Sequence, residues 1–253
     1  MKIMTSNIYA TQGYVIFKNF FKENELLKLE YILEKFHNVW LSNNQKDYKN
    51  GLINSHSITS SSYINEEERL FIFKFISKRN IEKIVGEIFP DEALFLNTQL
   101  FFEPFNRNQH NYWHRDIQYT GRSINEQKQK IKTENIVHFR IPLRRELGIE
   151  LIPSTHKEWD TDEEFETRLS LNGRKPSDNL QRGKIIQMDR GDLLVFSANM
   201  IHRGLYGNNR LTFDIIFCDN TQDFKSFLNI NDCPNTEEME SLKESKIFKK
   251  YII

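Results

Sequence analysis

The sequence has little cysteine, no excess charge of either sign and no long apolar run. Only Cys218 and Cys233 occur in 253 residues, and neither belongs to a C-x-x-C pair, which excludes a disulfide framework and a thiolate zinc cluster. Lys plus Arg equals Asp plus Glu at 35 each, so no global field recruits nucleic acid or an anionic membrane surface. No apolar run approaches bilayer-spanning length, and the first residues lack the apolar core and cleavage site of a signal peptide.

These absences predict a cytoplasmic protein that binds neither nucleic acid nor membrane. Its partners must therefore be argued from a local site, and a small-molecule substrate is the expectation. The length suits one large domain with a substantial core, so we treat residues 1–253 as a single domain. The sequence leaves the oligomeric state open.

The N-terminal part, residues 1–93, shows helical rather than strand periodicity after one short strand. Residues 14–20 are typical of a strand, and the apolar residues of the segment that follows recur at helical spacing through Phe36. Residues 38–63 are rich in Asn and Ser and predict a polar loop or lid. A second helical region is predicted over 65–89, with acidic residues in its first turn.

From residue 94 the sequence changes to short β-branched or aromatic segments bounded by Gly, Pro, Asn and Asp, which are typical of strands. About seven such segments fall within 94–220, one of them HNYWHRDIQY at 110–119. This predicts a mostly β fold with flanking helices, a jelly roll or barrel with the N-terminal helices packed on one sheet.

Polar stretches at 118–135 and 157–183 interrupt these strands and are predicted to be loops that close over a pocket. Residues 221–253 predict a C-terminal helix, capped by Asn235 or Thr236 with glutamates behind.

One candidate for chemistry is the pair His114 and Asp116. On an extended strand, side chains two positions apart project from the same face, so this pair would point together, with Tyr112 beside it. A His-x-Asp in a chain of this composition also arises by chance, as a surface pair, and is weak by itself.

A second segment strengthens the hypothesis that His114 and Asp116 carry chemistry. A strand with apolar alternation leads to His202, a turn of Gly207, Asn208 and Asn209 reverses the chain, and Arg210 opens the next strand. Two histidines and one carboxylate on strands of one barrel make the facial triad that binds non-haem Fe(II) and leaves three coordination positions free. A structural zinc site would close its shell with a fourth ligand, and no thiolate is placed to do so.

Arg210 has two interpretations. It is either a surface charge beside the turn or, next to His202, the guanidinium that binds the far carboxylate of a cosubstrate whose 2-oxo acid end chelates iron.

The segments YWHRD, GIELIPSTHKEW and GDLLVFSANMIHRG, followed by Arg210, resemble the phytanoyl-CoA dioxygenase family over about residues 94–218. LFFEPFNRNQHNYWHRD is also similar to the matching part of the family's ectoine hydroxylases. The resemblance implies an Fe(II)- and 2-oxoglutarate-dependent oxygenase on a double-stranded β-helix. His114 and Asp116 would be the proximal iron ligands, His202 the distal ligand and Arg210 the 2-oxoglutarate clamp.

The sequence departs from the family pattern in two places. The stretch between the distal histidine and the arginine is shorter, RGLYGNN, and the family's PGSH is PSTH here, so His156 is expected to stabilise a loop and not to bind metal. Thr212, on the face of Arg210, would supply the companion hydroxyl for the cosubstrate, and Tyr112 is expected near it.

Three further residues are candidates because of their strand parity. His138 and Arg140 share the polar face of a strand whose other face is apolar; this face either is solvated or lines the pocket, where it would bind substrate. Gln99 faces the same way as Asn97 and Phe101 and would hydrogen-bond cosubstrate or substrate.

The predicted reaction uses 2-oxoglutarate and O₂, releases succinate and CO₂, and hydroxylates an unactivated C–H bond of a small polar metabolite or natural-product intermediate. Asp116 argues against halogenation, because halogenating relatives carry a small residue there. Nucleic-acid demethylation of the AlkB kind would need a second Arg six positions after the clamp, and position 216 is Ile. The alternative from another class is a catalytically silent, cupin-like metal- or ligand-binding protein.

Overall fold

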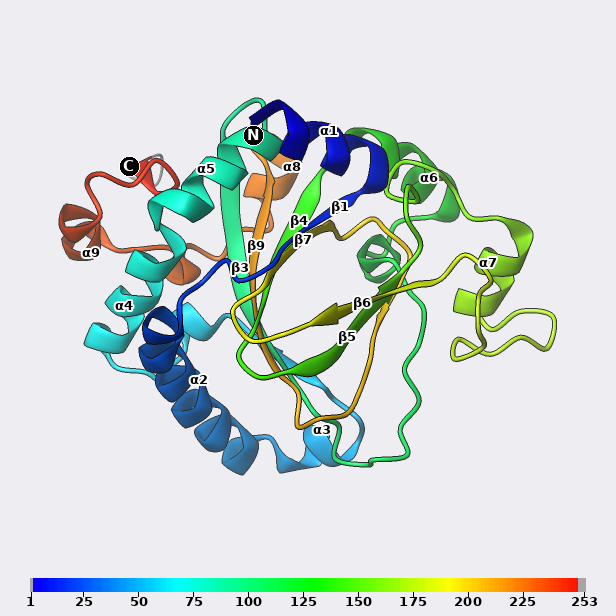
Figure 1. The fold of residues 1–253 in the computed structure, drawn as a ribbon, viewed down its shortest axis with the longest axis horizontal. Helices are drawn as coiled ribbons and strands as arrows, with labels where there is room; N and C mark the ends of the chain where they lie inside the picture. Colours follow the sequence, from blue (N-terminus) through cyan, green and yellow to red (C-terminus); the bar gives the residue numbers. More distant parts are fainter. Residues whose placement is uncertain (1, 250–253) are drawn as a thin grey trace.

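The computed structural model describes residues 2–249, which form two antiparallel sheets with helices around them (Figure 1). The larger sheet has six strands, in the order β1 (Tyr14–Phe17), β7 (Leu193–Ser197), β4 (Ile136–Pro142), β9 (Leu211–Asp219), β3 (Ala93–Phe102) and β2 (Asn54–His56). The smaller sheet has three, in the order β6 (Lys184–Met188), β5 (Glu146–Leu151) and β8 (His202–Gly204). Side chains of both sheets share one apolar cluster that includes Ile149, Met188 and Phe196, so the sheets pack face to face.

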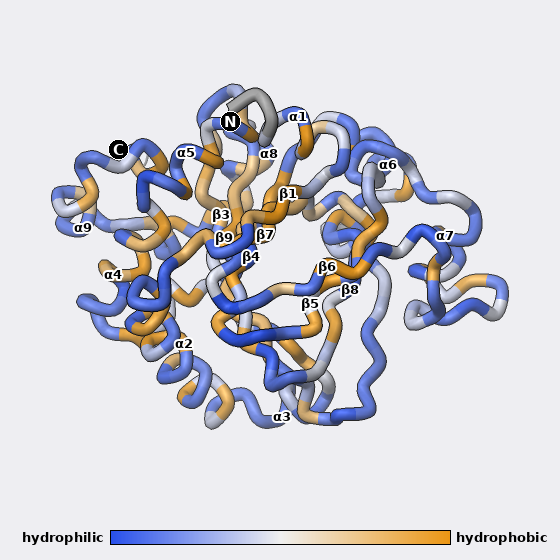
Figure 2. Tube along the Cα trace, in the orientation of Figure 1, coloured by the Kyte–Doolittle hydropathy of each residue, from blue (hydrophilic) through white to orange (hydrophobic). Residues whose placement is uncertain are grey.

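Helices cover the outer face of the larger sheet. The N-terminal helices are α1 (Lys2–Gln12), α2 (Glu23–Asn43), α3 (Gln45–Lys49), α4 (Glu66–Ile76) and α5 (Arg79–Ile88). The buried stripes of α2, α4 and α5 join residues of the sheet in the main core cluster. In Figure 2 these helices alternate between hydrophilic and hydrophobic residues, and the neighbouring strands are largely hydrophobic. The predicted packing of N-terminal helices on one sheet is confirmed. Across the described residues, no helix has the length and apolar character needed to cross a membrane.

The alternation of β4 and β9 places the polar residues between the two sheets. Val137, Phe139 and Ile141 of β4 enter the helix-side core, while His138 and Arg140 are buried on the opposite face. The polar face of this strand, for which the sequence allowed solvent or a pocket, therefore points into the interior.

The segment 38–63 is not the predicted structureless lid. Helix α2 continues to Asn43 because Trp40 extends its buried stripe, and α3, the edge strand β2 and a 3₁₀ turn, η1 (Ile58–Ser60), follow. β2 pairs with β3. The region predicted as one helix over 65–89 is two helices, α4 and α5, with Asn65 capping the first through the backbone N–H of Glu68.

The predicted strand at 110–119 is absent. His114 forms only an isolated bridge, and Asp116 opens a 3₁₀ helix, η2 (Asp116–Tyr119). The other predicted strands are present. The two stretches predicted as loops each contain a helix, α6 (Ile124–Thr133) and α7 (Asp162–Arg168).

The C-terminal segment contains α8 (Gln222–Lys225), a 3₁₀ turn η3 (Ile230–Asp232) and α9 (Thr236–Ser241). The predicted Asn235 cap is confirmed, but the predicted long helix is wrong, because α9 ends after six residues. Ile247 and Phe248 then pack into the main core, so tertiary burial overrides helix propensity. Residues 250–253 lie outside the described residues, and the division of the chain into parts of one domain stays a prediction.

Gly148 occupies a bulge in β5 that sets the position of Glu146 next to the site. The β5–β6 register shifts between Glu146 and Ile149, and Gly148 has a φ of +95°. A Cβ at this position would lie 1.9 Å from the backbone oxygen of Ile186. Both the backbone conformation and the space therefore require glycine.

We expect Gly148→Ala to lower the free energy of unfolding by about 3 kcal/mol or more, because it adds a backbone clash to left-handed strain. Gly121→Ala is the matched control, since Gly121 has a φ of +74° with nothing within 4 Å of its added Cβ, and about 1 kcal/mol is expected. Urea denaturation measures the free energy of unfolding of both variants. Equal losses in the two variants would contradict the close approach at Gly148.

Candidate active site

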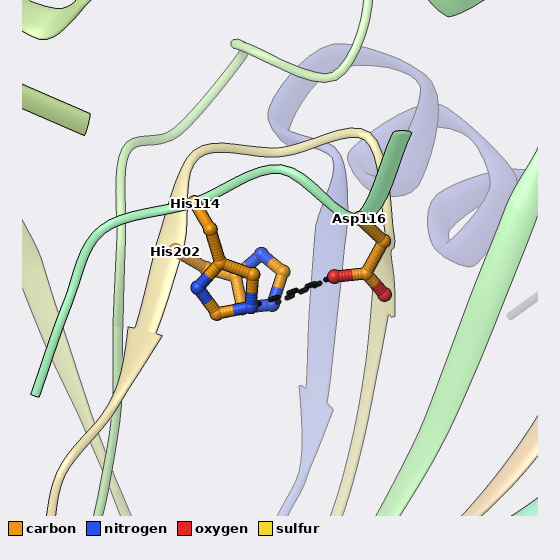
Figure 3. A group of neighbouring side chains, drawn as sticks. All are labelled: His114, Asp116 and His202. Atoms are coloured by element: carbon orange, nitrogen blue, oxygen red, sulfur yellow. Dashed lines mark ion pairs between the residues drawn. The ribbon is translucent and has the colours of Figure 1, made fainter. Parts of the chain in front are cut away.

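Two histidines from distant parts of the chain lie side by side through backbone pairing. His114 and His202 form an antiparallel bridge, in which the N–H of His114 donates to His202 O at 3.0 Å and the N–H of His202 donates to His114 O at 2.9 Å. Residues directly opposed in this way project to the same side. Figure 3 shows the two imidazoles next to each other, and their centroids are 4.2 Å apart.

Each imidazole is oriented by its own chain. His114 Nδ1 lies 3.1 Å from Tyr112 O, and His202 Nδ1 lies 3.0 Å from Met200 O. A carbonyl can only accept, so each Nδ1 carries the proton and each Nε2 keeps its lone pair. The two lone pairs are thereby available for a metal.

Asp116 completes the group from the first residue of η2. Its Oδ1 lies 3.5 Å from His114 Nε2 and 3.6 Å from His202 Nε2 (Figure 3). One ligand atom from each of the three residues lies within 4.8 Å of the others. The sequence prediction that these residues meet is confirmed, although the predicted strand geometry is not the reason: Asp116 reaches the histidines from a 3₁₀ turn.

The protonation states suit a divalent cation. Burial lowers the pKa of His114, and it lowers the pKa of His202 to about 3, so both imidazoles are neutral near neutral pH. Burial alone would raise the pKa of Asp116, but the hydrogen bond from His138 and the positive charges that the surrounding histidines carry at low pH outweigh burial and hold that pKa well below its usual range. Neutral imidazole and ionised carboxylate are the forms that ligate metal.

The donor set fits Fe(II). Within the described residues, the group contains two imidazoles and one carboxylate, with no further His, Cys, Asp or Glu that would close the shell. Three protein ligands with open positions are the arrangement of mononuclear non-haem iron oxygenases. Their assignment as ligands stays a prediction of the sequence that the geometry supports.

Arg115, between the two proximal ligands, anchors this segment. Its side chain is fully buried, its Nε donates to Asp160 Oδ1 at 2.8 Å, and its Nη1 donates to backbone oxygens of Thr155 and Asn199. Asn199 lies three residues before His202. One guanidinium therefore ties both halves of the triad to the same frame.

His138 and Arg140 lie on the cavity wall and are linked to the triad. His138 Nε2 lies 3.0 Å from Asp116 Oδ2, and its Nδ1 lies 2.8 Å from Asp214 Oδ2. Burial lowers the pKa of His138, but its bonds to the two carboxylates outweigh burial and raise that pKa to about 9. Arg140 binds Asp214 through Nε and Nη2. Contact of either residue with substrate stays a prediction.

Arg210 is buried immediately before β9 and points into the cavity. Its Nε lies 3.5 Å from Glu146 Oε2, beyond hydrogen-bond geometry, and neither Nε nor Nη1 has a hydrogen-bond partner among the described residues. A buried guanidinium with unpaired N–H groups is costly unless a ligand satisfies it. This supports the interpretation of Arg210 as an anion-binding group over that of a surface charge.

The turn before Arg210 is built as predicted. Gly207, Asn208 and Asn209 all have positive φ, and Glu103 Oε2 accepts the backbone N–H groups of Gly207 and Arg210, each at 3.1 Å. The short connection therefore still returns Arg210 to the cavity.

Thr212 lies on the face of Arg210, but its hydroxyl donates to Glu146 and it does not line the cavity. Its role with 2-oxoglutarate stays a prediction. Gln99 and Tyr112 do line the cavity, where Asn54 Nδ2 lies 3.4 Å from Gln99 Oε1.

The cavity that contains the triad has a volume of about 500 Å³. Beyond the predicted site residues, its wall is made of uncharged side chains: Leu52, Ile53, Asn54, Phe101, Tyr119, Gly204 and Tyr206. The predicted pocket-closing stretches 38–63 and 118–135 each contribute to this wall, and 157–183 does not. A larger hollow of about 960 Å³ beside α5 and the C-terminal segment contains none of the predicted site residues.

The sequence analysis missed Arg115, Glu146 and Asp214. Asp214 carried a usable signal, since it has the parity of Arg210 and Thr212 on one strand. Glu146 and Arg115 carried none, because their importance arises from partners far away in the sequence.

The family model for phytanoyl-CoA dioxygenase (PhyH) matches residues 9–208 of the chain. A comparison with curated proteins found no match.

Several solved structures share the fold. AviO1 from Streptomyces viridochromogenes matches with a TM-score of 0.60 at 13% identity, covering 87% of this chain and 96% of that one. SnoK, a non-haem α-ketoglutarate-dependent carbocyclase from nogalamycin biosynthesis, has a TM-score of 0.58 at 16% identity, with 93% and 94% covered. EctD from S. alaskensis, solved with 2-oxoglutarate and 5-hydroxyectoine, has a TM-score of 0.55 at 11% identity, with 85% and 74% covered.

These likenesses confirm the predicted jelly-roll fold. The extent of the family match and the His-Asp-His group confirm the resemblance stated from the sequence. The chain belongs to the phytanoyl-CoA dioxygenase (PhyH) family and is an Fe(II)- and 2-oxoglutarate-dependent oxygenase.

Proposed function

We propose that this oxygenase hydroxylates an unactivated C–H bond of a small polar metabolite or natural-product intermediate. One O₂ and one 2-oxoglutarate are consumed; one oxygen atom enters the substrate, the other enters succinate, and CO₂ is released. The supporting observation is that three metal-ligand atoms within 4.8 Å of one another share one cavity with Arg210, whose buried Nε and Nη1 have no partner among the described residues. We also propose a cytoplasmic location, which the scarcity of cysteine suggests.

The triad, Arg210 and the cavity wall have different proposed roles. His114, Asp116 and His202 would hold Fe(II), which when bound supplies the redox chemistry that couples decarboxylation of 2-oxoglutarate to oxidation of the substrate. Arg210 would bind the far carboxylate of 2-oxoglutarate as a charge-assisted pair. The walls of the cavity would orient the substrate and limit the access of water.

The cavity wall supports a polar, uncharged reacting group in the substrate. Once the triad and Arg210 are assigned, the remaining cations that line the described wall are Arg140 and protonated His138. Both are already paired with carboxylates: Arg140 makes a bidentate bond to buried Asp214, and His138 bonds to Asp214 and Asp116. A carboxylate or ammonium group of the substrate beside the metal would therefore lack a free counter-ion. Amide and tyrosine groups on the same wall, including Asn54, Gln99 and Tyr206, offer hydrogen bonds to hydroxyl or carbonyl groups.

Hydroxylation is the proposed outcome because Asp116 fills the position that halide would need. The neighbouring structures include SnoK, described as a carbocyclase, and SnoN, described as an epimerase. A screen of metabolites for substrate-stimulated succinate, with product analysis by mass, tests both the substrate class and the outcome.

We expect His114→Ala to reduce Fe(II)-dependent succinate formation by about 1000-fold, because removing a ligand costs several kcal/mol of metal-dependent stabilisation. His110→Ala is the control, since His110 is exposed and outside the triad, and its activity should match that of wild type. Succinate is quantified after incubation with 2-oxoglutarate, Fe(II) and O₂. Substantial activity in His114→Ala would reject this metal site.

We expect Arg210→Ala to raise the KM for 2-oxoglutarate by about 10–100-fold, because a charge-assisted pair contributes about 1.5–3 kcal/mol, while Fe(II) affinity stays unchanged. Arg145→Ala is the matched control, since Arg145 is 82% exposed. Anaerobic titration of the Fe(II) protein, monitored by its visible charge-transfer band, separates the two affinities. An unchanged KM would instead assign the 2-oxoglutarate clamp to Arg140. Arg203 is a weaker alternative, because it is bound to Glu150 and does not line the cavity.

A further inference from the structure

The two oxygens of Asp116 face different partners. Oδ1 faces the Nε2 atoms of both triad histidines, at 3.5 and 3.6 Å, whereas Oδ2 lies 3.0 Å from His138 Nε2. We infer that His138 and Asp214 are positioning residues that hold Asp116 as a one-oxygen metal ligand. The inference rests on the metal site of the proposed function.

The partners of the two Asp116 oxygens determine how many coordination positions of the metal this carboxylate would occupy. A carboxylate can ligate through one oxygen or both, and a second metal–oxygen contact would fill a position that the facial triad leaves open. Oδ2 turned toward the metal would have to leave His138. The hydrogen bond from His138 therefore favours the geometry in which Oδ1 alone faces the metal.

His138 is itself fixed on every side. Its Nδ1 lies 2.8 Å from Asp214 Oδ2, and since ionised carboxylates only accept, both of its ring N–H groups donate. The imidazole also stacks on Phe196, with centroids 4.9 Å apart and planes 20° from parallel. Rotation of the ring would break two hydrogen bonds and this stacking contact together.

Asp214 is fixed in turn by Arg140. The Arg140 Nε lies 3.0 Å from Asp214 Oδ1, and its Nη2 lies 2.9 Å from Oδ2. The guanidinium also lies over the rings of Phe101 and Phe196, at 4.6 and 5.3 Å from their centroids. Asp214 is completely buried, so its charge depends on these partners.

The register of the larger sheet builds this chain of contacts. Arg140 on β4 is directly opposite Asp214 on β9, and both strands are internal to the sheet. Asp116 belongs to η2, outside both sheets. The contacts through His138 thus connect a predicted ligand on a turn to two internal strands of the larger sheet.

Stability alone gives little reason for this arrangement. Three charged side chains in the interior carry a large desolvation cost, and a well-packed apolar set of similar volume is often at least as stable. The cost is understandable where the charged groups orient a metal ligand, because a loosely held carboxylate would change both metal affinity and coordination number.

The test uses Co(II) as the probe, since its visible absorption reports coordination number without turnover. His138→Leu removes both hydrogen bonds, and His138→Gln restores an N–H donor for Asp116. His156→Leu is the matched control, because His156 is also a buried histidine but contacts the backbone of Ala10 and lies outside the cavity. Circular dichroism and thermal melting verify that each variant folds.

We expect His138→Leu to lower Co(II) affinity by about 10–100-fold and to change the intensity of the visible bands, as loss of a partner of a metal ligand does elsewhere. His138→Gln should recover most of the affinity. His156→Leu should lower the melting temperature only, with wild-type affinity and spectrum. Should His138→Leu not fold, Asp214→Asn, which keeps the volume but weakens the hold on His138, should show a smaller loss in the same direction.

Wild-type affinity and an unchanged spectrum in folded His138→Leu, or in Asp214→Asn if His138→Leu does not fold, would overturn the positioning role. The positioning role would also be overturned if His138→Gln did not recover the Co(II) affinity that His138→Leu loses. The loss would then follow from a general disruption of the site. If the wild-type protein binds no Co(II) at these residues, the proposed metal site fails instead, and the two failures are distinguishable.

Discussion

The backbone bridge between His114 and His202 is the contact on which the site depends. Two short hydrogen bonds place two chain segments in register, and a slip of one residue would turn one imidazole away from the other. Arg115, next to His114, secures the same register because its buried guanidinium binds the backbone oxygen of Asn199, three residues before His202. Contacts within the protein therefore hold the predicted ligand side chains in position, as a catalytic metal site with open coordination positions requires.

The charged groups of the interior differ in how completely they are hydrogen-bonded. Asp214 bonds to both His138 and Arg140, and the second oxygen of Asp116 is occupied by His138. Arg210, which would bind a ligand, has Glu146 nearby at 3.5 Å but keeps nitrogens without a hydrogen bond. Among the described residues that line the cavity, Arg210 is the buried cation with two nitrogens that lack a hydrogen-bond partner. Since a buried N–H group without a hydrogen-bond partner is costly, these two nitrogens mark where an anion is expected to bind.

The shared fold does not select the reaction. The chain matches structures at 10–16% identity whose descriptions include a carbocyclase and an epimerase, so the jelly roll supplies the frame and the cavity wall must supply the specificity. In this chain that wall is formed by β2 and the residues before it, the tyrosines near His114, and the neutralised Arg140. The substrate proposal rests on these features of the wall.

The sequence by itself determined the elements with strong periodicity: the stripe of α2, the alternation of β4 and β9, and the Gly-Asn-Asn turn before Arg210. It also predicted which three residues meet, because His-x-Asp and a later histidine at the end of a strand are local patterns. Only the tertiary structure decided that residues 110–119 form a bridge and a 3₁₀ turn, that 38–63 contains an edge strand, and that Glu146 and Asp214 join the site. The physical reason is that such features depend on pairing and burial between segments far apart in the chain, where local propensity is a weak guide.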